Sequence, residues 1–310
     1  MSAPENMHCG YVAVLGAPNA GKSTLVNRLV GAKVTIVSPK VQTTRNRVLG
    51  IAVSGDAQIV FIDTPGIFTP KKRFDRAMVA AAWGGAKEAD VVVLMVDAKS
   101  GFDKDTRIIV DGLEKYAEEG PGEGKRRPVF LVLNKIDLVK PEALLALTQR
   151  LHDAGKFDHT FMISALSGEG VDDLMAAILP GLPKGHWLFP EDQLSDMPQR
   201  LLAAEITREQ VFLQLHQELP YAIAVETEAW ENFDNGDVKI DQVVYVQRDS
   251  QKGIVLGKGG SRIKEIGAQA RAQLETMLDC KVHLFLRVKK HDKWSEDPRY
   301  FRALGLDYNA

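Results

Sequence analysis

Short continuous apolar runs, rich in β-branched residues, alternate along the first 180 residues with segments whose apolar residues recur at helical spacing. Runs without regular polar alternation are typical of strands covered on both faces. The alternation predicts right-handed βαβ units and a doubly wound α/β sheet. The predicted strands are 11–16, 58–63, 90–98, 128–135 and 160–165, and the predicted helices are 24–31, 105–119, 141–155 and 170–182.

The pattern changes at residues 180–198, where four prolines exclude a regular helix or a central strand. The segment is therefore predicted to be a linker. An earlier stretch, residues 118–128, is rich in Gly, Pro and charge and is predicted to be an exposed loop. Beyond the linker the predicted elements are a helix at 199–218, strands at 221–230, 240–248 and 281–290, and a helix at 261–278.

This second αββαβ pattern predicts a small α+β domain. The predicted division is a first domain over residues 1–180, a linker over 181–198 and a second domain over 199–310. A length of 310 residues allows each domain its own core. A hydrophobic fraction of 45% with 26% charged residues is ordinary for a folded protein.

Net charge and cysteine content exclude several classes of protein. A net charge of -2 argues against coating nucleic acid by bulk charge and leaves a local basic face open. Cys9 and Cys280 are the only cysteines, so the chain has no disulfide framework and no CxxC pair. Because no apolar stretch approaches 18 residues and the N-terminus lacks signal-peptide features, we expect a cytoplasmic protein.

Residues 16–23 read GAPNAGKS and match the phosphate-binding pattern GxxxxGK[ST] between a predicted strand and a predicted helix. Backbone N–H groups of such a loop bind phosphate oxygens, Lys22 reaches the β and γ phosphates, and Ser23 binds Mg²⁺. By itself this motif leaves ATP and GTP open. The residues assigned to phosphate binding are Gly16, Asn19, Ala20, Gly21, Lys22, Ser23, Thr24 and Gly66.

Two further motifs follow predicted strands. Asp63 ends the strand 58–63 and is placed to hold Mg²⁺ through a water, while Gly66 can offer its N–H to the γ phosphate. The carboxylate of Asp137, in NKID, can accept hydrogen bonds from the guanine N1–H and 2-amino groups, which adenine lacks. The residues assigned to guanine binding are Asn134, Lys135, Asp137, Ser164, Ala165 and Leu166.

A glycine cluster near the C-terminus, Gly257-Lys258-Gly259-Gly260, fits a GxxG loop between two helices of a KH domain, where a nucleic-acid backbone can approach closely. Arg262 and Lys264 add positive charge beside it. Between residues 252 and 290 nine basic residues oppose three acidic ones, which indicates a local RNA-binding surface. These six residues from Gly257 to Lys264 are the predicted RNA-binding set.

The first 180 or so residues resemble a Ras-like GTPase domain, and the whole chain resembles the Era family of bacterial GTPases. The matching segments are GAPNAGKSTLVNRLVGAKVTIVSPKVQTTR, DTPG, NKID and SAL. The resemblance implies a P-loop GTPase domain followed by a type II KH domain. It also implies that the protein binds GTP and GDP, hydrolyses GTP, binds the 3′ end of small-subunit (16S) rRNA and assists assembly of the 30S ribosomal subunit.

The resemblance also assigns two switch segments. The first is Gln42-Thr43-Thr44-Arg45, in which we favour Thr44 over Thr43 as the residue that closes on Mg²⁺, and the second is Asp63-Thr64-Pro65-Gly66-Ile67. Ile67 replaces the glutamine that orients the attacking water in many Ras-like proteins, which implies slow intrinsic hydrolysis. In related potassium-activated GTPases an asparagine at the position of Asn19 helps hold K⁺. The predicted metal ligands are thus Ser23, Thr44 and Asp63 for Mg²⁺, with Asn19 for K⁺.

Two alternative functions have their own distinguishing features. NKID argues against an ATP-driven kinase or helicase. A membrane-associated regulatory GTPase whose C-terminal domain binds protein or anionic lipid is the second alternative, because positive charge also suits lipid headgroups. Peripheral contact with the cytoplasmic face of the inner membrane belongs to this alternative. We expect a monomer.

Overall fold

The computed structural model describes residues 7–118, 126–215 and 219–310, so most of the predicted loop 118–128 lies outside the described residues. The chain divides into two compact units. The N-terminal unit comprises residues up to Thr35, Thr44–Asp196 and Phe301–Ala310, and the C-terminal unit comprises Ile36–Thr43 and Met197–Tyr300. Each unit thus contains one segment from the other half of the chain, residues 36–43 in the C-terminal unit and residues 301–310 in the N-terminal unit. We call these the exchanged segments, and the division predicted from the sequence included neither of them.

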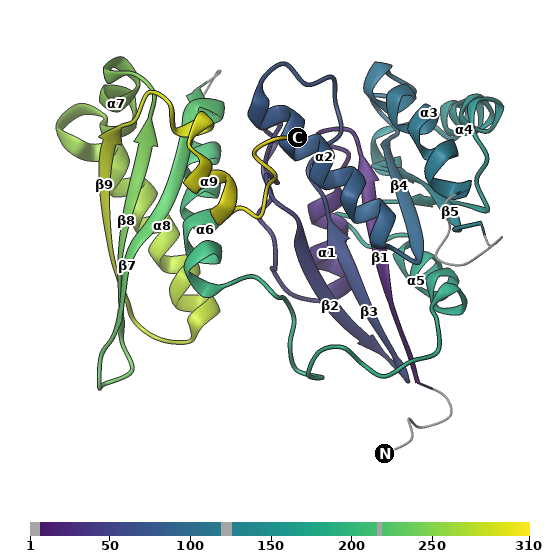
Figure 1. The fold of residues 1–310 in the computed structure, drawn as a ribbon, viewed down its shortest axis with the longest axis horizontal. Coiled ribbons are helices and arrows are strands. Elements are labelled where there is room, and N and C mark those ends of the chain that lie inside the picture. Colours follow the sequence, from purple (N-terminus) through teal and green to yellow (C-terminus); the bar gives the residue numbers. More distant parts are fainter. Residues whose placement is uncertain (1–6, 119–125, 216–218) are drawn as a thin grey trace. The chain divides into compact units, whose positions relative to one another are not determined.

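A six-stranded sheet in the order β2-β3-β1-β4-β5-β6 forms the centre of the N-terminal unit (Figure 1). All neighbouring strands are parallel except β2, which runs antiparallel to β3. The doubly wound sheet predicted from the apolar runs is therefore present, with an antiparallel edge. Its strands are β1 His8–Gly16, β2 Val48–Ser54, β3 Ala57–Asp63, β4 Val91–Asp97, β5 Val129–Asn134 and β6 His159–Ile163.

Helices cover both faces of this sheet. Alternate residues of one strand belong to opposite core clusters, with Val93 packing beside α1 and α5 and Val92 packing beside α2, α3 and α4. Burial on both faces explains why the strand sequences lack polar alternation. The helices are α1 Lys22–Val30, α2 Arg73–Glu88, α3 Lys104–Glu118, α4 Pro141–Ala154 and α5 Val171–Ile178.

The sequence analysis missed β2 and α2. β2 forms a hairpin with β3 through Gly55, whose φ of 57° lies in the left-handed region. It is an edge strand that pairs with β3 alone, so its formation depends on that partner. α2 begins where Asp75 Oδ2 accepts the N–H groups of Lys71 and Lys72, at 3.1 and 3.0 Å. This cap comes from a charged stretch that lacks a conventional N-cap residue.

The predicted linker packs along the N-terminal unit as far as Asp196. Gln58 Oε1, on β3, accepts the backbone N–H groups of Leu188 and Phe189 at 2.9 and 3.0 Å. Isolated bridges join His8 to Lys184 and Gly50 to Ser195. Prolines exclude a helix here, as predicted, but the segment is held on the surface of this unit.

In the C-terminal unit three strands pack against helices, with β8 between β7 and β9 (Figure 1). The observed order is αββααβ, because α7 precedes the glycine cluster; the predicted αββαβ order omitted it. Ile266, Ala270 and Leu274 on α8 are buried. The elements are α6 Gln199–Gln214, β7 Ile223–Asn232, β8 Val238–Val246, α7 Asp249–Leu256, α8 Ser261–Leu278 and β9 Val282–Lys290. A further helix, α9 Pro298–Ala303, runs across the division between the two units at Phe301.

The first exchanged segment, residues 36–43, packs on α6 within the C-terminal unit. The fully buried Arg208 guanidinium donates to the carbonyl oxygens of Gln42 and Thr43, at 3.3 and 2.5 Å, and pairs with Glu205. Glu209 Oε1 accepts the N–H of Val37 at 2.8 Å. This segment is therefore held by buried, charge-assisted hydrogen bonds.

The second exchanged segment, residues 301–310, packs on α2 within the N-terminal unit. Phe301 is fully buried, and its ring meets that of Phe74 edge to face with centroids 5.4 Å apart. The Arg73 guanidinium lies 4.4 Å from the centroid of the Tyr308 ring. Aromatic and cation–π contacts thus fix the C-terminal segment on this helix. Among the described residues, no helix combines the length and the apolar character needed to cross a membrane.

Candidate nucleotide site and nucleic-acid interface

The phosphate-binding loop joins β1 to α1 at the carboxyl end of the sheet. Lys22 Nζ donates to the carbonyl oxygens of Gly16 and Ala17 at 3.1 and 3.0 Å. Burial lowers the pKa of Lys22 to about 8, although nearby Asp63 opposes the shift. Asn19 has a φ of 63°, a left-handed conformation that asparagine tolerates better than most residues. The loop therefore has the curled backbone and the buried lysine that phosphate binding requires.

Hydroxyl groups gather around the carboxylate of Asp63. Oδ2 accepts hydrogen bonds from Ser23 at 2.8 Å, Thr35 at 3.0 Å and Thr44 at 3.3 Å. Oδ1 is buried and has no hydrogen-bond partner within the described chain. Burial raises the pKa of Asp63, and Lys22 and the three hydroxyls lower it. An orphaned carboxylate oxygen beside hydroxyl oxygens fits Mg²⁺, which prefers oxygen ligands.

The two candidate threonines of the first switch have different surroundings. Thr44 Oγ1 lies 2.8 Å from Ser23 Oγ, beside Asp63. Thr43 Oγ1 instead donates to Lys40 O at 2.6 Å and belongs to the C-terminal unit. Of the two threonines, therefore, Thr44 lies with the other predicted Mg²⁺ ligands. The next residue in the predicted switch, Arg45, is fully buried near the Phe74 ring.

The second switch packs against the phosphate-binding loop. The N–H of Ile67 donates to Gly16 O at 3.1 Å, and the Ile67 side chain is fully buried in the core. Thr64 Oγ1 donates to Val14 O at 2.7 Å, and Pro65 is buried. A Cβ on Gly66 would lie 2.9 Å from Pro18 Cα, so only glycine fits this close approach. The side chain of Ile67 is thus directed into the core, where it contributes no polar group to the site.

Asn134 ties the guanine motifs to the phosphate loop. Its Nδ2 donates to Ala20 O at 2.8 Å, and its Oδ1 accepts the N–H of Ala165 at 2.9 Å. Lys135 Nζ donates to Asn19 O at 2.8 Å and pairs with Asp97 at 2.5 Å. The Asn134 side chain therefore bonds both the phosphate-binding loop and the 164–166 segment, and Lys135 makes a second bond to the phosphate-binding loop.

Two of the residues predicted to contact the base, Asp137 and Leu166, lie at the surface of this framework. Asp137 is exposed on a single 3₁₀ turn, Ile136–Leu138. Ser164 is buried, whereas the Leu166 side chain is 79% exposed. The exposed carboxylate is available to a base, as the hydrogen-bond argument requires.

Three residues at this site were missed by the sequence analysis. Asp97 ends a predicted strand, the same signal that identified Asp63, and sequence inspection could have found it. Thr35 precedes the predicted first switch, and no motif marked it. Arg28, in the last turn of α1, donates to the carbonyl oxygens of Ala165 and Leu166. That contact joins residues more than 130 positions apart, so no local sequence motif predicts it.

The glycine cluster of the C-terminal unit contains two open glycines and one closed glycine. Gly259 and Gly260 have φ values of 60° and 79°, and a Cβ on either would meet no described atom within 4 Å. A Cβ on Gly257, in contrast, would lie 2.8 Å from Arg262 Cβ. The backbone at Gly259 and Gly260 is therefore accessible to a ligand, whereas Gly257 is required by local packing.

Six of the nine residues in the predicted basic excess fall into two groups. Lys258 and Lys264 are exposed and Arg262 is half-buried, and no ion pair involves these three within the described residues. At the other end of the segment, on β9, acidic partners neutralise the charge. Arg287 and Lys289 pair with Glu228, and Lys290 pairs with Asp249. Of these two groups, the one beside the glycines therefore carries the positive charge that is not neutralised.

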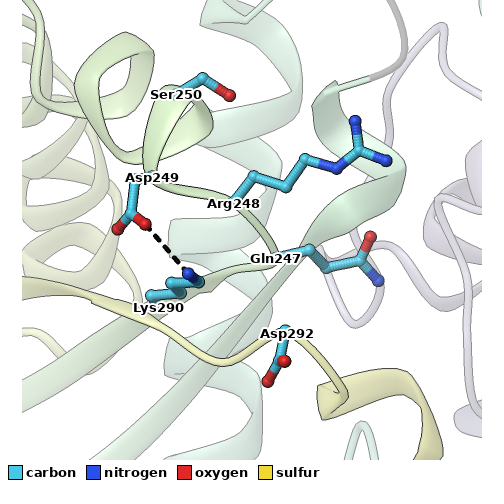
Figure 2. A pocket seen from close by; sticks show the side chains of 6 residues that line it. All are labelled: Gln247, Arg248, Asp249, Ser250, Lys290 and Asp292. Atoms are coloured by element: carbon cyan, nitrogen blue, oxygen red, sulfur yellow. Dashed lines mark hydrogen bonds and ion pairs between the residues drawn. The ribbon is translucent and has the colours of Figure 1, made fainter.

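Figure 2 shows a polar hollow of about 450 Å³ in the same unit, at the start of α7 and the end of β9. Lys290 points toward Asp249, and their 2.9 Å pair crosses the hollow. Because acidic residues balance the basic ones, we do not assign it to RNA. Its lining residues are Gln247, Arg248, Asp249, Ser250, Lys290 and Asp292.

Comparison with known proteins identifies both units. Residues 11–135 match the family model described as 50S ribosome-binding GTPase, and residues 218–295 match the KH domain model. GTPase Era of Afipia carboxidovorans is 54% identical over 98% of this chain and 99% of its own. GTPase Era of Rhizobium meliloti is 56% identical over 96% of this chain and 93% of its own.

Two solved structures resemble the whole chain. Era in complex with MgGDPNP and nucleotides 1506–1542 of 16S ribosomal RNA is 42% identical with a TM-score of 0.89, covering 97% of this chain and 99% of that one. A variant of Aquifex aeolicus Era bound to GDP and AlF₄⁻ is 42% identical with a TM-score of 0.86, covering 96% and 99%. Identity at this level over nearly the full length, together with the nucleotide motifs in place, shows that the chain belongs to the Era family of GTPases.

Proposed function

We propose that this GTPase is a nucleotide-controlled RNA-binding protein, which binds the 3′ end of 16S rRNA through its KH unit and assists 30S subunit assembly. The observation that carries the proposal is the open backbone of Gly259 and Gly260, beside basic side chains that pair with no acidic residue in the described chain. A relative at 42% identity has been solved with MgGDPNP and nucleotides 1506–1542 of that RNA. Similarity to that protein over 97% of this chain supports the same class of ligand.

In the nucleotide site, the residues that would hold Mg²⁺ are Ser23, Thr44 and, through water, Asp63. When bound, Mg²⁺ neutralises negative charge on the β and γ phosphates. The ammonium of Lys22 moves from the carbonyl oxygens of its own loop to phosphate oxygens, a stronger, charge-assisted interaction. Gly66, close to Pro18, can present its N–H to the γ phosphate.

Ile67 cannot orient the attacking water, because its side chain is apolar and buried in the core. We therefore expect a slow intrinsic rate. The left-handed backbone at Asn19 exposes a loop position where a side-chain oxygen can help hold K⁺ beside the phosphates. A cation there would supply positive charge in the transition state, as an arginine finger does in other GTPases.

The first switch supplies a covalent route from nucleotide to RNA-binding unit. Thr44 lies among the predicted Mg²⁺ ligands, and the adjacent Thr43 is held by Arg208 of α6. A change in Thr44 on loss of the γ phosphate would reach, through one peptide bond, a segment that is bonded to the C-terminal unit. We propose that nucleotide state alters RNA affinity through this connection.

Titration with a single-stranded RNA that copies the 3′ end of 16S rRNA tests the RNA proposal. Gly259→Asp places a carboxylate where phosphate approaches, and we expect RNA affinity to fall at least about tenfold. Gly236→Asp is a matched control, because Gly236 also has a positive φ of 87° and no described atom within 4 Å of an added Cβ, but lies in the β7–β8 turn. GTP binding should be unchanged in both variants.

Equal RNA affinity of wild type and folded Gly259→Asp would contradict the assignment. Selective loss of binding to vesicles containing anionic lipid would instead favour a membrane-associated GTPase. A higher affinity for RNA with GDPNP than with GDP tests the switch separately. The monomeric state, the cytoplasmic location and peripheral membrane contact stay predictions.

A further inference from the structure

Arg28 occupies a position outside every nucleotide motif, yet it contacts the loop assigned to guanine. It lies in the last turn of α1, the helix that begins in the phosphate-binding loop. Its Nε donates to Ala165 O at 2.7 Å, and its Nη2 donates to Leu166 O. The guanidinium fork therefore holds two consecutive carbonyl groups.

The loop is anchored as far as Ala165, whose side chain is 2% exposed and packs in the core, but it loses this anchorage at the next residue. The Leu166 side chain is 79% exposed, so packing does not fix the backbone there. The N–H of Ala165 is held by Asn134 Oδ1 at 2.9 Å. Asn134 thus fixes the amide before Ala165, and Arg28 fixes the two carbonyls that follow.

The planarity of the peptide bond links these contacts to base recognition. In a trans peptide the N–H points opposite to the C=O of the same bond. Because Ala165 C=O is directed at Arg28, the N–H of Leu166 is directed away from α1. The next N–H, that of Ser167, donates to Ser164 Oγ at 3.3 Å, so the Leu166 N–H is the one of the two that remains for an acceptor oxygen of the base.

We propose that Arg28 is a positioning residue for guanine recognition, which orients the Leu166 N–H toward the O6 oxygen of the base. This inference rests on the guanine site proposed at Asp137 and 164–166. The Arg28 guanidinium donates to the loop backbone, so it acts through the loop and not on the phosphates.

A stabilising role or a long-range electrostatic role for Arg28 would each leave base recognition unaffected. Arg28 lies at a helix C-terminus, where positive charge is favourable, and a purely stabilising role would affect all nucleotides equally. An electrostatic effect on the triphosphate would also be independent of the base. A nucleotide that differs only at O6 separates both roles from positioning.

The experiment compares GTP with 6-thioguanosine 5′-triphosphate, in which sulfur, a weaker acceptor, replaces O6. Wild type should bind GTP more tightly. In Arg28→Ala the dissociation constant of GTP should rise about fivefold while that of the thio analogue changes less than about twofold, so that the two constants converge. The KM for GTP should rise with kcat unchanged, because base contacts are the same in ground and transition states.

Arg28→Lys keeps the charge but loses the fork, and it should give an intermediate GTP affinity. Arg107→Ala is the matched control for charge, since Arg107 is exposed on the same unit and lies over the Phe102 ring. Equal weakening of both nucleotides in Arg28→Ala, or wild-type affinity for both, would overturn the proposal. Wild type that fails to prefer GTP over the thio analogue would instead overturn the contact between the 164–166 loop and O6.

Discussion

The nucleotide site and the glycine cluster proposed to bind RNA differ in how their residues are arranged. In the nucleotide site, motif residues already bond one another: Asn134 bonds Ala20 and Ala165, and Lys135 bonds Asn19. At Gly259, no described atom lies within 4 Å of the position of an added Cβ. The first site is a preorganised network, whereas the second is an open stretch of backbone beside exposed cations.

The difference predicts two kinds of response to substitution. A network whose members position each other loses function steeply when one is removed, because the others lose their geometry as well. An open backbone binds through access and charge, so single changes there should have graded effects unless they block access. Substitutions in the nucleotide site therefore test for steep losses, and substitutions in the glycine cluster test for graded ones.

Removal of phosphate or metal contacts should have the largest effect. Lys22→Ala or Ser23→Ala should reduce Mg²⁺-dependent GTP turnover by at least about 100-fold, because each removes a group that stabilises charge on the phosphates. Single-turnover hydrolysis is the measurement. Lys99→Ala removes an exposed lysine from the same unit and should leave turnover unchanged. Turnover near wild type in both site variants would contradict the phosphate-loop assignment.

A change of base specificity should come next in size. Asp137→Asn converts an acceptor pair into an acceptor and a donor, so the preference for GTP over xanthosine triphosphate should invert by about 100-fold. Competition binding with both nucleotides measures this inversion. Asp173→Asn, on the exposed side of α5, is the control. If Asp137→Asn retains the wild-type preference, the guanine base is recognised elsewhere.

Dependence on K⁺ should be smaller. Hydrolysis should be about tenfold faster in K⁺ than in Na⁺ at equal ionic strength, since one added charge stabilises the transition state by roughly 1.4 kcal/mol. Asn19→Gly should abolish the difference. Glycine is the informative substitution because φ at this position is 63°, which alanine adopts only with strain. Equal rates in the two salts would exclude the K⁺ site.

The smallest effect is expected for alanine at the open glycine. Gly259→Ala meets no described atom within 4 Å and should lower RNA affinity less than about threefold, with about 1 kcal/mol lost from the free energy of unfolding because φ is 60°. Gly257→Ala should destabilise more, since its Cβ would lie 2.8 Å from Arg262 Cβ. Thermal unfolding and RNA titration of both variants provide the measurement. A larger loss for Gly259→Ala would mean that the two glycines have been assigned the wrong roles.

Much of the fold could be predicted because its signals are local. Buried parallel strands such as 90–98 are continuous apolar runs, and the helix after Gly21 follows a recognisable loop. β2 was missed because an edge strand depends on its partner, and α7 because eight residues carry too little helical periodicity. Prolines correctly excluded helix from 180–198 but could not reveal its contacts with Gln58.

The site was predictable to the extent that its groups lie in contiguous motifs. Lys22, Asp63 and Asn134 were predicted from motif spacing, and in the structure they lie at the carboxyl ends of the parallel strands. Thr35 and Arg28 were not found, because their contacts join residues far apart in sequence. The basic excess was counted correctly, but its partial neutralisation by Glu228 depends on strand register.

The exchange of segments 36–43 and 301–310 between the two units has a consequence for how this gene can recombine. A single crossover at residue 197 would join a foreign C-terminal domain to a chain that still carries residues 36–43, whose acceptors for Arg208 would meet a different helix. The chimaera would also lose Phe301, so the foreign domain would have to supply another side chain that packs against Phe74. Inheritance of the two halves as one unit is therefore favoured by the fold itself, and chimaeras should require both segments to be transplanted together.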